Sequence, residues 1–455
     1  MEINSSLIQQ VFPAFTGEEV LTFQNVFTDS RKQVENGLFI PLVGERFDGH
    51  DFIQKAKENG AIASLWQKDH DVPKEVTLPL FFVEDTLKAL QQLARLYLEE
   101  CRPTVIGITG SNGKTTTKDM VEAICNTTFR TYKTQGNFNN HIGLPLTILS
   151  MPVDTEILIL EMGMSGFHEI ELLSQLARPT YGIITNIGDS HLEQLKTRAN
   201  IAKAKLEIKA GLQQDGILII DGDEPLLENE LRKKQTISCG FSAKNDRVIG
   251  EIQQEKGGLS FCIKGSSTRY HIPYFGYHNS KNAAYAIVIG QLLKINEEKM
   301  KEALQQLTLT SMRFEMIPLK NGALLINDAY NASPTSMKAA LETLSSMSGY
   351  SKKVAVLGDM YELGHHEKRM HESVVEMIDD SISLVCTIGK KAKWIHEKLK
   401  QEKKAIQSMH FTTKEDAVVV IKTLLEKDMV VLLKASRGMQ LETIAEALQE
   451  GRENH

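Results

Sequence analysis

The stretch that most constrains this chain is residues 104–117, which read TVIGITGSNGKTTT. Apolar residues before Gly110 predict a buried strand, and the apolar spacing after Lys114 predicts a helix. Backbone N–H groups in such a glycine-containing loop converge on anionic oxygens, and the helix N-terminus adds positive potential. Lysine neutralises phosphate charge and a following hydroxyl suits Mg2+. The stretch therefore predicts a nucleotide-binding loop made of Gly110, Ser111, Asn112, Gly113, Lys114, Thr115 and Thr116.

The loop departs from the common G-x-x-x-x-G-K-[ST] pattern, because Ile108 stands where the first glycine would be. What remains is G-x-x-G-K-T. An ordinary strand-to-helix turn is the alternative, but it gives no reason for a lysine followed by three threonines. The strand-loop-helix context favours nucleotide binding.

Composition limits the other classes of function. The length of 455 residues predicts about three domains, and 42% apolar with 24% charged residues is typical of a soluble globular protein. A net charge of -6 gives no electrostatic reason to expect nucleic acid or an anionic membrane as partner. Five cysteines without C-x-x-C spacing, and no signal-peptide or membrane-spanning pattern, predict a cytoplasmic protein without zinc. We expect a monomer.

The order of apolar segments predicts an α/β fold of three domains. A small α/β domain would occupy residues 1–100, a central phosphate-loop domain with a mostly parallel sheet residues 101–312, and a C-terminal Rossmann-like domain residues 313–455. Two predicted central strands, 155–163 and 181–191, end near Glu161 and His191. Functional side chains of parallel sheets commonly lie at the carboxyl ends of the strands, so we expect these two side chains to be ligands of Mg2+. The alternative is that they only form structural hydrogen bonds.

Three further segments can each be interpreted in two ways, as ordinary structural elements or as parts of a functional site. The TDSR segment, with Asp29, Ser30 and Arg31, predicts either a polar ligand contact or a turn with a solvated arginine. The predicted helix at 198–212 contains Lys203, Lys205 and Lys209, and we expect two of these three lysines to face solvent. Asn279 and Asn282 open an apolar helix, where asparagine also serves as a cap.

Ten motifs of this chain occur in the order and spacing typical of the Mur ligases. The resemblance spans about residues 28–442 and rests on GITGSNGKTTTK, QGNFNNHIGLPLTIL, EMGMSGFHEI, ITNIGDSHLE, AKAKLEI, HNSKNAAYA, MRFE, NDAYNASPTSM, LGDMYELG and KASRGMQLE. Within the family, several of them resemble the branch that joins D-alanyl-D-alanine to a UDP-N-acetylmuramoyl-tripeptide. Ala435 departs from the glycine often found in that branch, with little effect expected.

The resemblance implies roles for individual residues. It implies a first domain that binds the uridine nucleotide sugar, a second that binds ATP, and a third that closes over both. The implied substrate contacts are Asp29, Ser30, Arg31, Asn137, Asn139, Asn140, Lys434, Ser436 and Arg437, and the implied further nucleotide contacts are Asn279, Asn282, Arg313, Asp328, Tyr330 and Asn331. The implied catalytic residues are Lys114, Glu161, His191 and Lys205, and the implied metal ligands are Thr115, Glu161, His191 and Lys205.

In the resembling enzymes the lysine at the position of Lys205 carries a carbamate, which turns a cation into an oxygen ligand for Mg2+. ATP would activate the tripeptide carboxylate as an acyl phosphate for attack by the amine. Two alternatives stay open: another Mur-type or folylpolyglutamate-type ligase, and an ATP-binding regulator without catalysis. The third peptide residue, lysine or diaminopimelate, also stays open.

Overall fold

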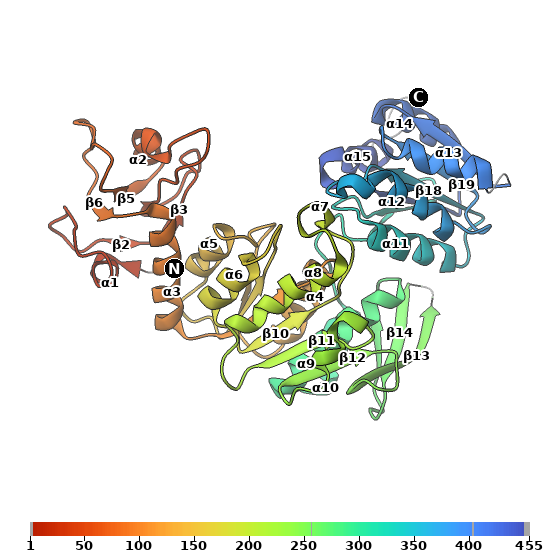
Figure 1. Cartoon of the computed structure of the whole chain (residues 1–455), viewed down its shortest axis with the longest axis horizontal. Helices are drawn as coiled ribbons and strands as arrows, with labels where there is room; N and C mark the ends of the chain where they lie inside the picture. Colours follow the sequence, from red (N-terminus) through yellow and green to blue (C-terminus); the bar gives the residue numbers. More distant parts are fainter. Residues whose placement is uncertain (1–2, 256, 403–404, 450–455) are drawn as a thin grey trace. The chain divides into compact units, whose positions relative to one another are not determined.

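The computed structural model describes residues 3–255, 257–402 and 405–449. The chain divides into two compact units. Figure 1 labels the helices and strands along the chain. The first unit contains residues 1–109, 128–182 and 207–217, and the second contains residues 110–127, 183–206 and 218–455. No helix within the described ranges is long and apolar enough to span a bilayer. Parallel sheets covered by helices recur along the chain, so the predicted α/β fold class is confirmed.

The helices and strands have the following bounds. The strands are β1 Ile3–Asn4, β2 Thr22–Phe23, β3 Asn25–Phe27, β4 Gly37–Phe39, β5 Ala61–Gln67, β6 Leu80–Val83, β7 Thr104–Thr109, β8 Thr131–Lys133, β9 Ile157–Glu161, β10 Tyr181–Ile184, β11 Ile217–Asp221, β12 Thr236–Gly240, β13 Arg247–Glu255, β14 Gly258–Ile263, β15 Arg269–Ile272, β16 Glu315–Pro318, β17 Leu324–Asn327, β18 Lys352–Gly358, β19 Leu384–Ile388, β20 Gln407–Phe411 and β21 Met429–Lys434. The α-helices are α1 Ser5–Gln9, α2 Ile53–Glu58, α3 Thr86–Cys101, α4 Lys114–Cys125, α5 Gly143–Ser150, α6 Glu169–Ala177, α7 Leu192–Leu195, α8 Arg198–Leu206, α9 Tyr277–Leu292, α10 Glu297–Gln305, α11 Pro334–Ser346, α12 Glu367–Ser373, α13 Lys393–Glu402, α14 Lys414–Leu424 and α15 Glu442–Gln449. The 3-10 helices are η1 Gly49–Phe52, η2 Glu207–Ala210, η3 Pro225–Glu230, η4 Gly364–His366, η5 Val374–Met377 and η6 Arg437–Met439.

The first unit begins with a two-stranded antiparallel sheet, β1-β2, which is followed by a four-stranded parallel sheet in the order β3-β4-β5-β6. Helix α3 follows it and starts at Asp85, whose carboxylate accepts a hydrogen bond from Lys88 N and satisfies a free helix donor. Its apolar residues recur at helical spacing and are buried: Ala89, Leu90, Leu93, Ala94, Tyr97 and Leu98. This face lets α3 pack against α5.

Within the same unit, β7 and β8 both pair in parallel with β9. All five residues of β9, ILILE, are buried, which fits a central parallel strand covered on both faces. The strand ends at Glu161, so the sequence predicted this carboxylate's place at a strand end correctly.

The second unit contains α4, which packs against α9, and the strands from β11 onward. Strands β11, β12 and β13 pair in parallel, whereas β13, β14 and β15 form an antiparallel meander. These strands lie beside one another in the order β15-β14-β13-β12-β11. The alternation of strands and helices predicted the parallel part and missed the antiparallel edge.

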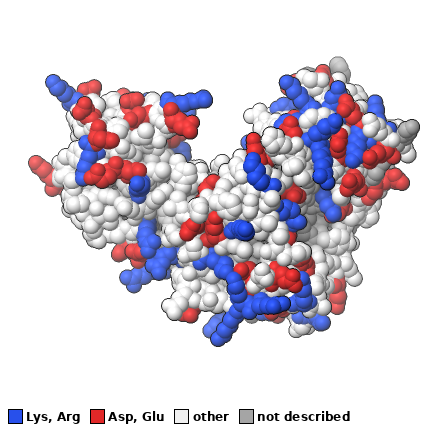
Figure 2. All heavy atoms as spheres, viewed as in Figure 1, with Lys and Arg blue, Asp and Glu red and all other residues white. Residues whose placement is uncertain are grey.

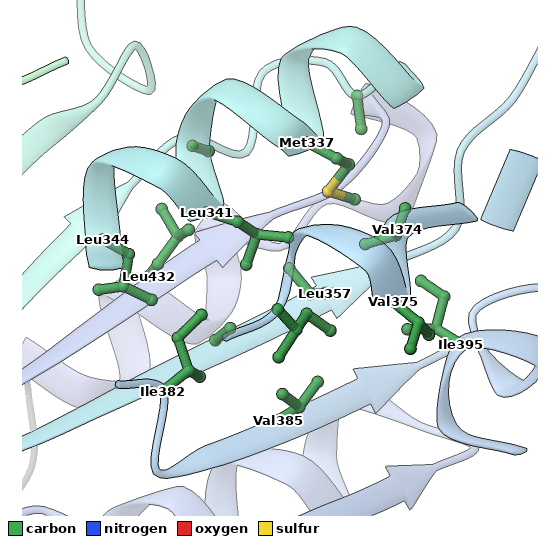
Figure 3. Close-up of a cluster of buried hydrophobic side chains, with 14 of the residues drawn as sticks. Met337, Leu341, Leu344, Leu357, Val374, Val375, Ile382, Val385, Ile395 and Leu432 are labelled. Carbon is green, nitrogen blue, oxygen red and sulfur yellow. The ribbon is translucent and has the colours of Figure 1, made fainter. Parts of the chain in front are cut away.

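The C-terminal sheet of the second unit has the order β16-β17-β21-β18-β19-β20. Its pairs are parallel except for β16 with β17, and helices cover both faces, as predicted for a Rossmann-like module. Figure 3 shows the core on one face, where Met337 and Leu341 of α11 meet Leu357 of β18 and Val385 of β19. This core fixes the strand ends that carry the polar loops.

Charged side chains of both signs are interspersed on the face of the molecule that Figure 2 shows. This distribution agrees with the net charge of -6 and gives no continuous basic surface on this face. A polyanion such as nucleic acid would need such a surface to neutralise its phosphates.

Candidate phosphate-binding site

The loop between β7 and α4 requires glycine at two positions. Gly110 has a φ of +149°, and a Cβ there would lie 1.8 Å from Thr185 Oγ1. Gly113 has a φ of +80° directly before the first residue of α4, and a Cβ there would lie 2.8 Å from Asn282 Oδ1. Side chains at either position would be strained and would displace neighbouring groups. The predicted strand-loop-helix arrangement of this stretch is confirmed.

Residues that follow β10 hold this loop in place. Asn186 Oδ1 accepts from Asn112 N at 2.9 Å, and Thr185 Oγ1 donates to Asn112 O at 2.6 Å. On the other side, Ser111 Oγ accepts from Gly188 N at 2.9 Å. The loop is therefore fixed on both sides by the ITNIG segment.

Polar groups at the loop remain available for a ligand. Lys114 Nζ donates to Gly110 O at 2.8 Å, so the lysine folds back over its own loop. Asn112 Nδ2 is buried and has no hydrogen-bond partner among the described residues. Buried polar groups are normally paired, so an orphaned donor beside a lysine indicates a place for an anionic or polar ligand.

Arg313 reaches the same helix start. Its Nη2 donates to Thr115 Oγ1 at 3.2 Å, and its guanidinium lies 3.9 Å from the centre of the Tyr330 ring. The Arg313 Nε is buried without a partner in the part of the chain that the structure describes. The structure thus brings Thr115, Arg313 and Tyr330 together, three of the residues predicted to surround the nucleotide and its metal.

Lys205 is buried in α8, with 2% of its surface exposed. Burial lowers the pKa of its ammonium well below the ordinary value, and the positive charge of Lys114 lowers it further. No ion pair or hydrogen bond of its Nζ is present among the described residues. Lys203, two positions earlier, is exposed. The expectation that the lysines of this helix mostly face solvent holds for Lys203, whereas Lys205 is buried.

His191 does not stand at a strand end, as the sequence predicted for it. Strand β10 ends at Ile184, and His191 lies at the start of the short helix α7 with a φ of +61°. The loop between Ile184 and His191 was missed because apolar residues continue as far as Ile187, beyond the end of the strand. The His191 Nδ1 lies 2.6 Å from Glu362 Oε2, and the contact with His191 lowers the pKa of the Glu362 carboxyl.

In the first unit, Asn139 contacts Glu161. Asn139 Nδ2 donates to Glu161 Oε1 at 3.0 Å, and Glu161 N donates to Thr134 Oγ1 at 3.0 Å. Asn140 Oδ1 accepts from Gly143 N at 2.8 Å at the start of α5. Asn137 is exposed. Of the three predicted substrate asparagines, one orients a carboxylate and one stabilises a helix start.

The predicted uridine-nucleotide residues of the first unit form a surface turn after β3. Arg31 Nε and Nη2 donate to the two carboxylate oxygens of Asp29 at 2.9 Å each, and the Arg31 side chain is 85% exposed. The hydrogen bond from Arg31 lowers the pKa of Asp29 to about 2. Ser30 O accepts from Asn59 Nδ2 at 2.7 Å. Both readings of this segment, turn and ligand contact, fit the geometry.

The remaining predicted residues lie in the second unit. Asp328 Oδ2 accepts from the buried Lys434 Nζ at 2.5 Å, and Lys434 also donates to Asn331 O at 3.2 Å. Ser436 Oγ accepts from Tyr361 N at 2.9 Å. The polar ends of β17 and β21 therefore meet, as their parallel pairing requires. Other predicted positions have these neighbours: Asn279 Nδ2 donates to Phe275 O, Asn282 Nδ2 to Asn279 Oδ1, and Arg437 Nη1 to Glu442 Oε1.

Comparison with known proteins connects this site to a family. Models of three families match the chain: the Mur ligase family, catalytic domain, at residues 22–98; the Mur ligase middle domain at 108–290; and the Mur ligase, glutamate ligase domain, at 312–437. The UDP-N-acetylmuramoyl-tripeptide–D-alanyl-D-alanine ligase of Bacillus subtilis is 48% identical over 433 residues, which cover 95% of this chain and 94% of the relative. The chain belongs to the Mur ligase family.

Solved structures agree with this assignment. The MurF of Acinetobacter baumannii superposes with a TM-score of 0.88 at 28% identity over 99% of each chain. The MurF ligase of Thermotoga maritima, solved in complex with ADP, superposes with a TM-score of 0.83 at 30% identity over 94% of this chain and 97% of that chain. These superpositions show that the chain has the α/β fold with three Mur ligase domains.

Sequence reasoning missed several residues of the site. Thr185 and Asn186 support the phosphate loop, and their signal was the ITNIG motif that we had read only as a strand end. Glu362 contacts His191 although it stands far away in the sequence. Only a structure brings such a pair together.

Proposed function

We propose that this Mur ligase uses ATP to join D-alanyl-D-alanine to a UDP-N-acetylmuramoyl-tripeptide, releasing ADP and phosphate in the formation of a peptidoglycan precursor. The observation that carries the proposal is the phosphate loop, whose glycines at 110 and 113 leave no room for a Cβ, within a chain that is 48% identical, over 95% of its length, to a Bacillus subtilis ligase named for this reaction. The ADP complex of the Thermotoga maritima relative supports the choice of nucleotide.

The chemistry begins with a carboxylate that an amine cannot attack at neutral pH. An oxygen of the tripeptide carboxylate attacks the γ-phosphorus of ATP, ADP leaves, and an acyl phosphate forms. The amine of D-alanyl-D-alanine then attacks the acyl carbon, phosphate leaves, and the amine loses a proton as the amide forms. Proteins catalyse such transfers mainly by positioning and by stabilising charge.

The residues of the phosphate loop supply the positioning. Backbone N–H groups of residues 110–115 and the Lys114 ammonium face the triphosphate in this proposal. Lys114 exchanges its contact with Gly110 O for a phosphate oxygen. Arg313, which already touches Thr115, adds a second positive charge beside the nucleotide. Asn279, Asn282, Asp328, Tyr330 and Asn331 would complete the nucleotide contacts.

Mg2+ belongs to the same proposal, in which Thr115, Glu161, His191 and a carbamate on Lys205 would supply its ligands. A bound Mg2+ would offset charge on the phosphate oxygens. The buried Ser190 Oγ beside His191 lacks a partner within the described residues, which fits a polar ligand at this position. Because Mg2+ prefers oxygen, one imidazole with a bare ammonium would be a poor donor set.

Carbamate formation requires a neutral amine, and the environment of Lys205 supplies one. Burial and the charge of Lys114 disfavour its ammonium form. The neutral amine attacks CO2, loses a proton and becomes a carboxylate-like ligand with two oxygens. Lys203 of the same helix is exposed and lacks this burial.

Substrate contacts belong to the same proposal. The UDP group would meet Asp29, Ser30 and Arg31 of the domain predicted at residues 1–100. Asn137, Asn139 and Asn140 would line the path of the muramoyl-peptide, and Lys434, Ser436 and Arg437 would do so from the domain predicted at residues 313–455. We place the enzyme in the cytoplasm as a monomer, and its five free cysteines fit a reducing compartment.

One assay tests the proposal against its alternatives. The purified protein is incubated with ATP, D-alanyl-D-alanine and two UDP-muramoyl-tripeptides that end in lysine or diaminopimelate, while phosphate and product mass are measured. Phosphate release together with a product heavier by one D-alanyl-D-alanine, less water, supports the ligase and identifies the tripeptide. In a parallel incubation with ATP, a folate and glutamate, phosphate release there and not with the tripeptides indicates the folylpolyglutamate type. No release with any acceptor indicates a regulator.

A further inference from the structure

The turn at residues 29–31 and the loop at residues 135–142 meet within the first unit, although they are far apart in the sequence. Lys32 directly follows the turn, and its Nζ lies 5.7 Å from the centre of the Phe138 ring. A lysine ammonium within about 6 Å of a ring centre is attracted to the negative face of the ring. Helix α5, which follows the loop, also packs against β3, the strand that precedes the turn. The surrounding elements therefore support the contact.

The loop presents the Phe138 ring from a fixed backbone. Gly163 N donates to Asn139 O at 2.8 Å, which anchors the residue after Phe138. A Cβ on Gly143 would lie 2.4 Å from the Phe138 Cα, so the start of α5 can approach the loop this closely only with glycine. Phe138 is nevertheless 38% exposed. The ring is thus held at the surface, where the Lys32 side chain lies against it.

The charge of Lys32 is not compensated by the other charged residues of the turn. Arg31 Nε and Nη2 donate to the two carboxylate oxygens of Asp29 at 2.9 Å each, so these two charges offset each other. The Lys32 Nζ forms no ion pair and no hydrogen bond with any residue that the structure describes. Its three N–H donors are therefore available to a ligand, and lysine binds phosphate groups as a compact point charge.

A second lysine–phenylalanine pair of the chain has a different environment. In the second unit, Lys281 Nζ lies 4.9 Å from the centre of the ring of Phe241, which is 40% exposed. The same Nζ lies 2.7 Å from Asp221 Oδ1 and 2.9 Å from Asp223 Oδ2, so its charge is paired within the protein. Lys32 has the aromatic ring without the carboxylates. Of the two lysines, only Lys32 is placed to exchange its surroundings for an anion.

We propose that Lys32 binds the diphosphate of the UDP-sugar substrate and that Phe138 is a positioning residue for the Lys32 ammonium. This inference rests on the proposed function, in which the turn meets the uridine nucleotide and the asparagines of the loop meet the muramoyl-peptide. The diphosphate is the group that joins these two parts of the substrate, so its place is where the turn and the loop meet. Contact with the ring restricts the lysine before the ligand binds, and less conformational entropy is then lost on binding.

The test compares the affinities for UDP and for uridine, which lacks phosphate, by ligand-observed NMR without ATP or peptide. Lys32→Ala should weaken UDP binding about 10-fold or more, since hydrogen bonds to charged groups contribute on this scale, and should leave uridine binding unchanged. Phe138→Leu keeps apolar bulk but loses the aromatic face, so UDP binding should weaken about two- to fivefold. Phe138→Trp keeps an aromatic face and should stay within about twofold of the wild type.

A double variant separates positioning from direct binding. If Phe138 acts through the lysine, Phe138→Leu has no further effect on UDP affinity in a Lys32→Ala background, and the two losses are not additive. Phe241→Leu is the matched control, because it alters the other lysine–phenylalanine pair, and it should leave UDP affinity unchanged.

Four results overturn the inference: unchanged UDP affinity in Lys32→Ala, an equal loss of UDP and uridine affinity in that variant, additive losses in the double variant, or a wild type that binds no UDP. Failure of the proposed function would appear separately. In that case the wild type would bind UDP through Lys32 and Phe138 but would form no amide from the substrates.

Discussion

The phosphate loop at residues 110–113 and the turn at residues 29–31 are both predicted to bind phosphate-containing ligands, yet they are built in opposite ways. The loop is fixed by Asn186 and Thr185, and its glycines have no room for a Cβ. The turn is held by the pair of Arg31 with Asp29, in which the Arg31 side chain is 85% exposed, and by the hydrogen bond from Asn59 Nδ2 to Ser30 O. The loop is thus held by buried and half-buried contacts on both sides, whereas the arginine of the turn lies in solvent.

The comparison predicts that small changes to the loop are severe. Gly110→Ala should reduce kcat/KM by about 1000-fold, since a shifted loop misaims several N–H donors and one such donor is worth about 100- to 1000-fold. It should also reduce the free energy of unfolding by about 1–3 kcal/mol through overpacking against Thr185. Steady-state kinetics and urea unfolding measure both. Gly250→Ala, where no atom lies within 4 Å of the added Cβ, is the control. Equal effects of the two substitutions would refute the account of the loop.

The buried lysine beside the loop should behave as a ligand precursor. Lys205→Ala should lower kcat/KM by about 100-fold, corresponding to about 2.7 kcal/mol of lost transition-state stabilisation, and acetate should restore several-fold activity. Lys203→Ala, in the exposed position of the same helix, should stay within about twofold of wild type. An equal loss of kcat/KM in both variants, or full wild-type activity in CO2-free buffer, would contradict a carbamate on Lys205.

Lys205 also predicts a pH dependence of stability. Its pKa is lowered in the folded protein, so below the ordinary lysine pKa of about 10.4 the unfolded chain binds a proton that the folded chain releases. The stability contribution of Lys205 therefore falls as pH decreases from about 10 toward the lowered pKa. Lys205→Met removes this dependence. Urea midpoints of both proteins in CO2-free buffers from about pH 7 to pH 10 should diverge toward low pH in favour of the variant, and parallel curves would contradict the burial argument.

The turn should show the smallest effect. Arg31→Ala should raise KM for the UDP substrate about three- to tenfold with little change in kcat, because binding to a remote group affects ground and transition states alike. The melting temperature should stay within about 1 °C, since the arginine is exposed and its single partner is local. Melting curves and saturation kinetics decide this. A large loss of kcat would mean that the turn belongs to the catalytic machinery.

The sequence predicted those parts of the site that depend on local chemistry. The need for glycine at 110 and 113 and the burial of β9 follow from short-range sterics and apolar pattern. The antiparallel edge β13-β14-β15 was missed, because we expected strands and helices to alternate there.

Long-range contacts explain the remaining failures. Helical spacing cannot distinguish the buried Lys205 from the exposed Lys203, because the burial of one depends on what packs against α8. His191 was placed at a strand end although the strand stops at Ile184. Glu362, which lies close to His191 in the structure, is far from it in the sequence, so only the fold places the two residues together.

The most direct test of the central claim follows oxygen through the reaction. The tripeptide substrate is labelled with 18O at the carboxylate that forms the new amide, and the released phosphate is analysed by mass spectrometry. Activation as an acyl phosphate transfers one carboxylate oxygen to phosphorus, so each phosphate released should carry one 18O while the amide keeps the other. Phosphate free of 18O, formed at the same rate as amide, would contradict the account.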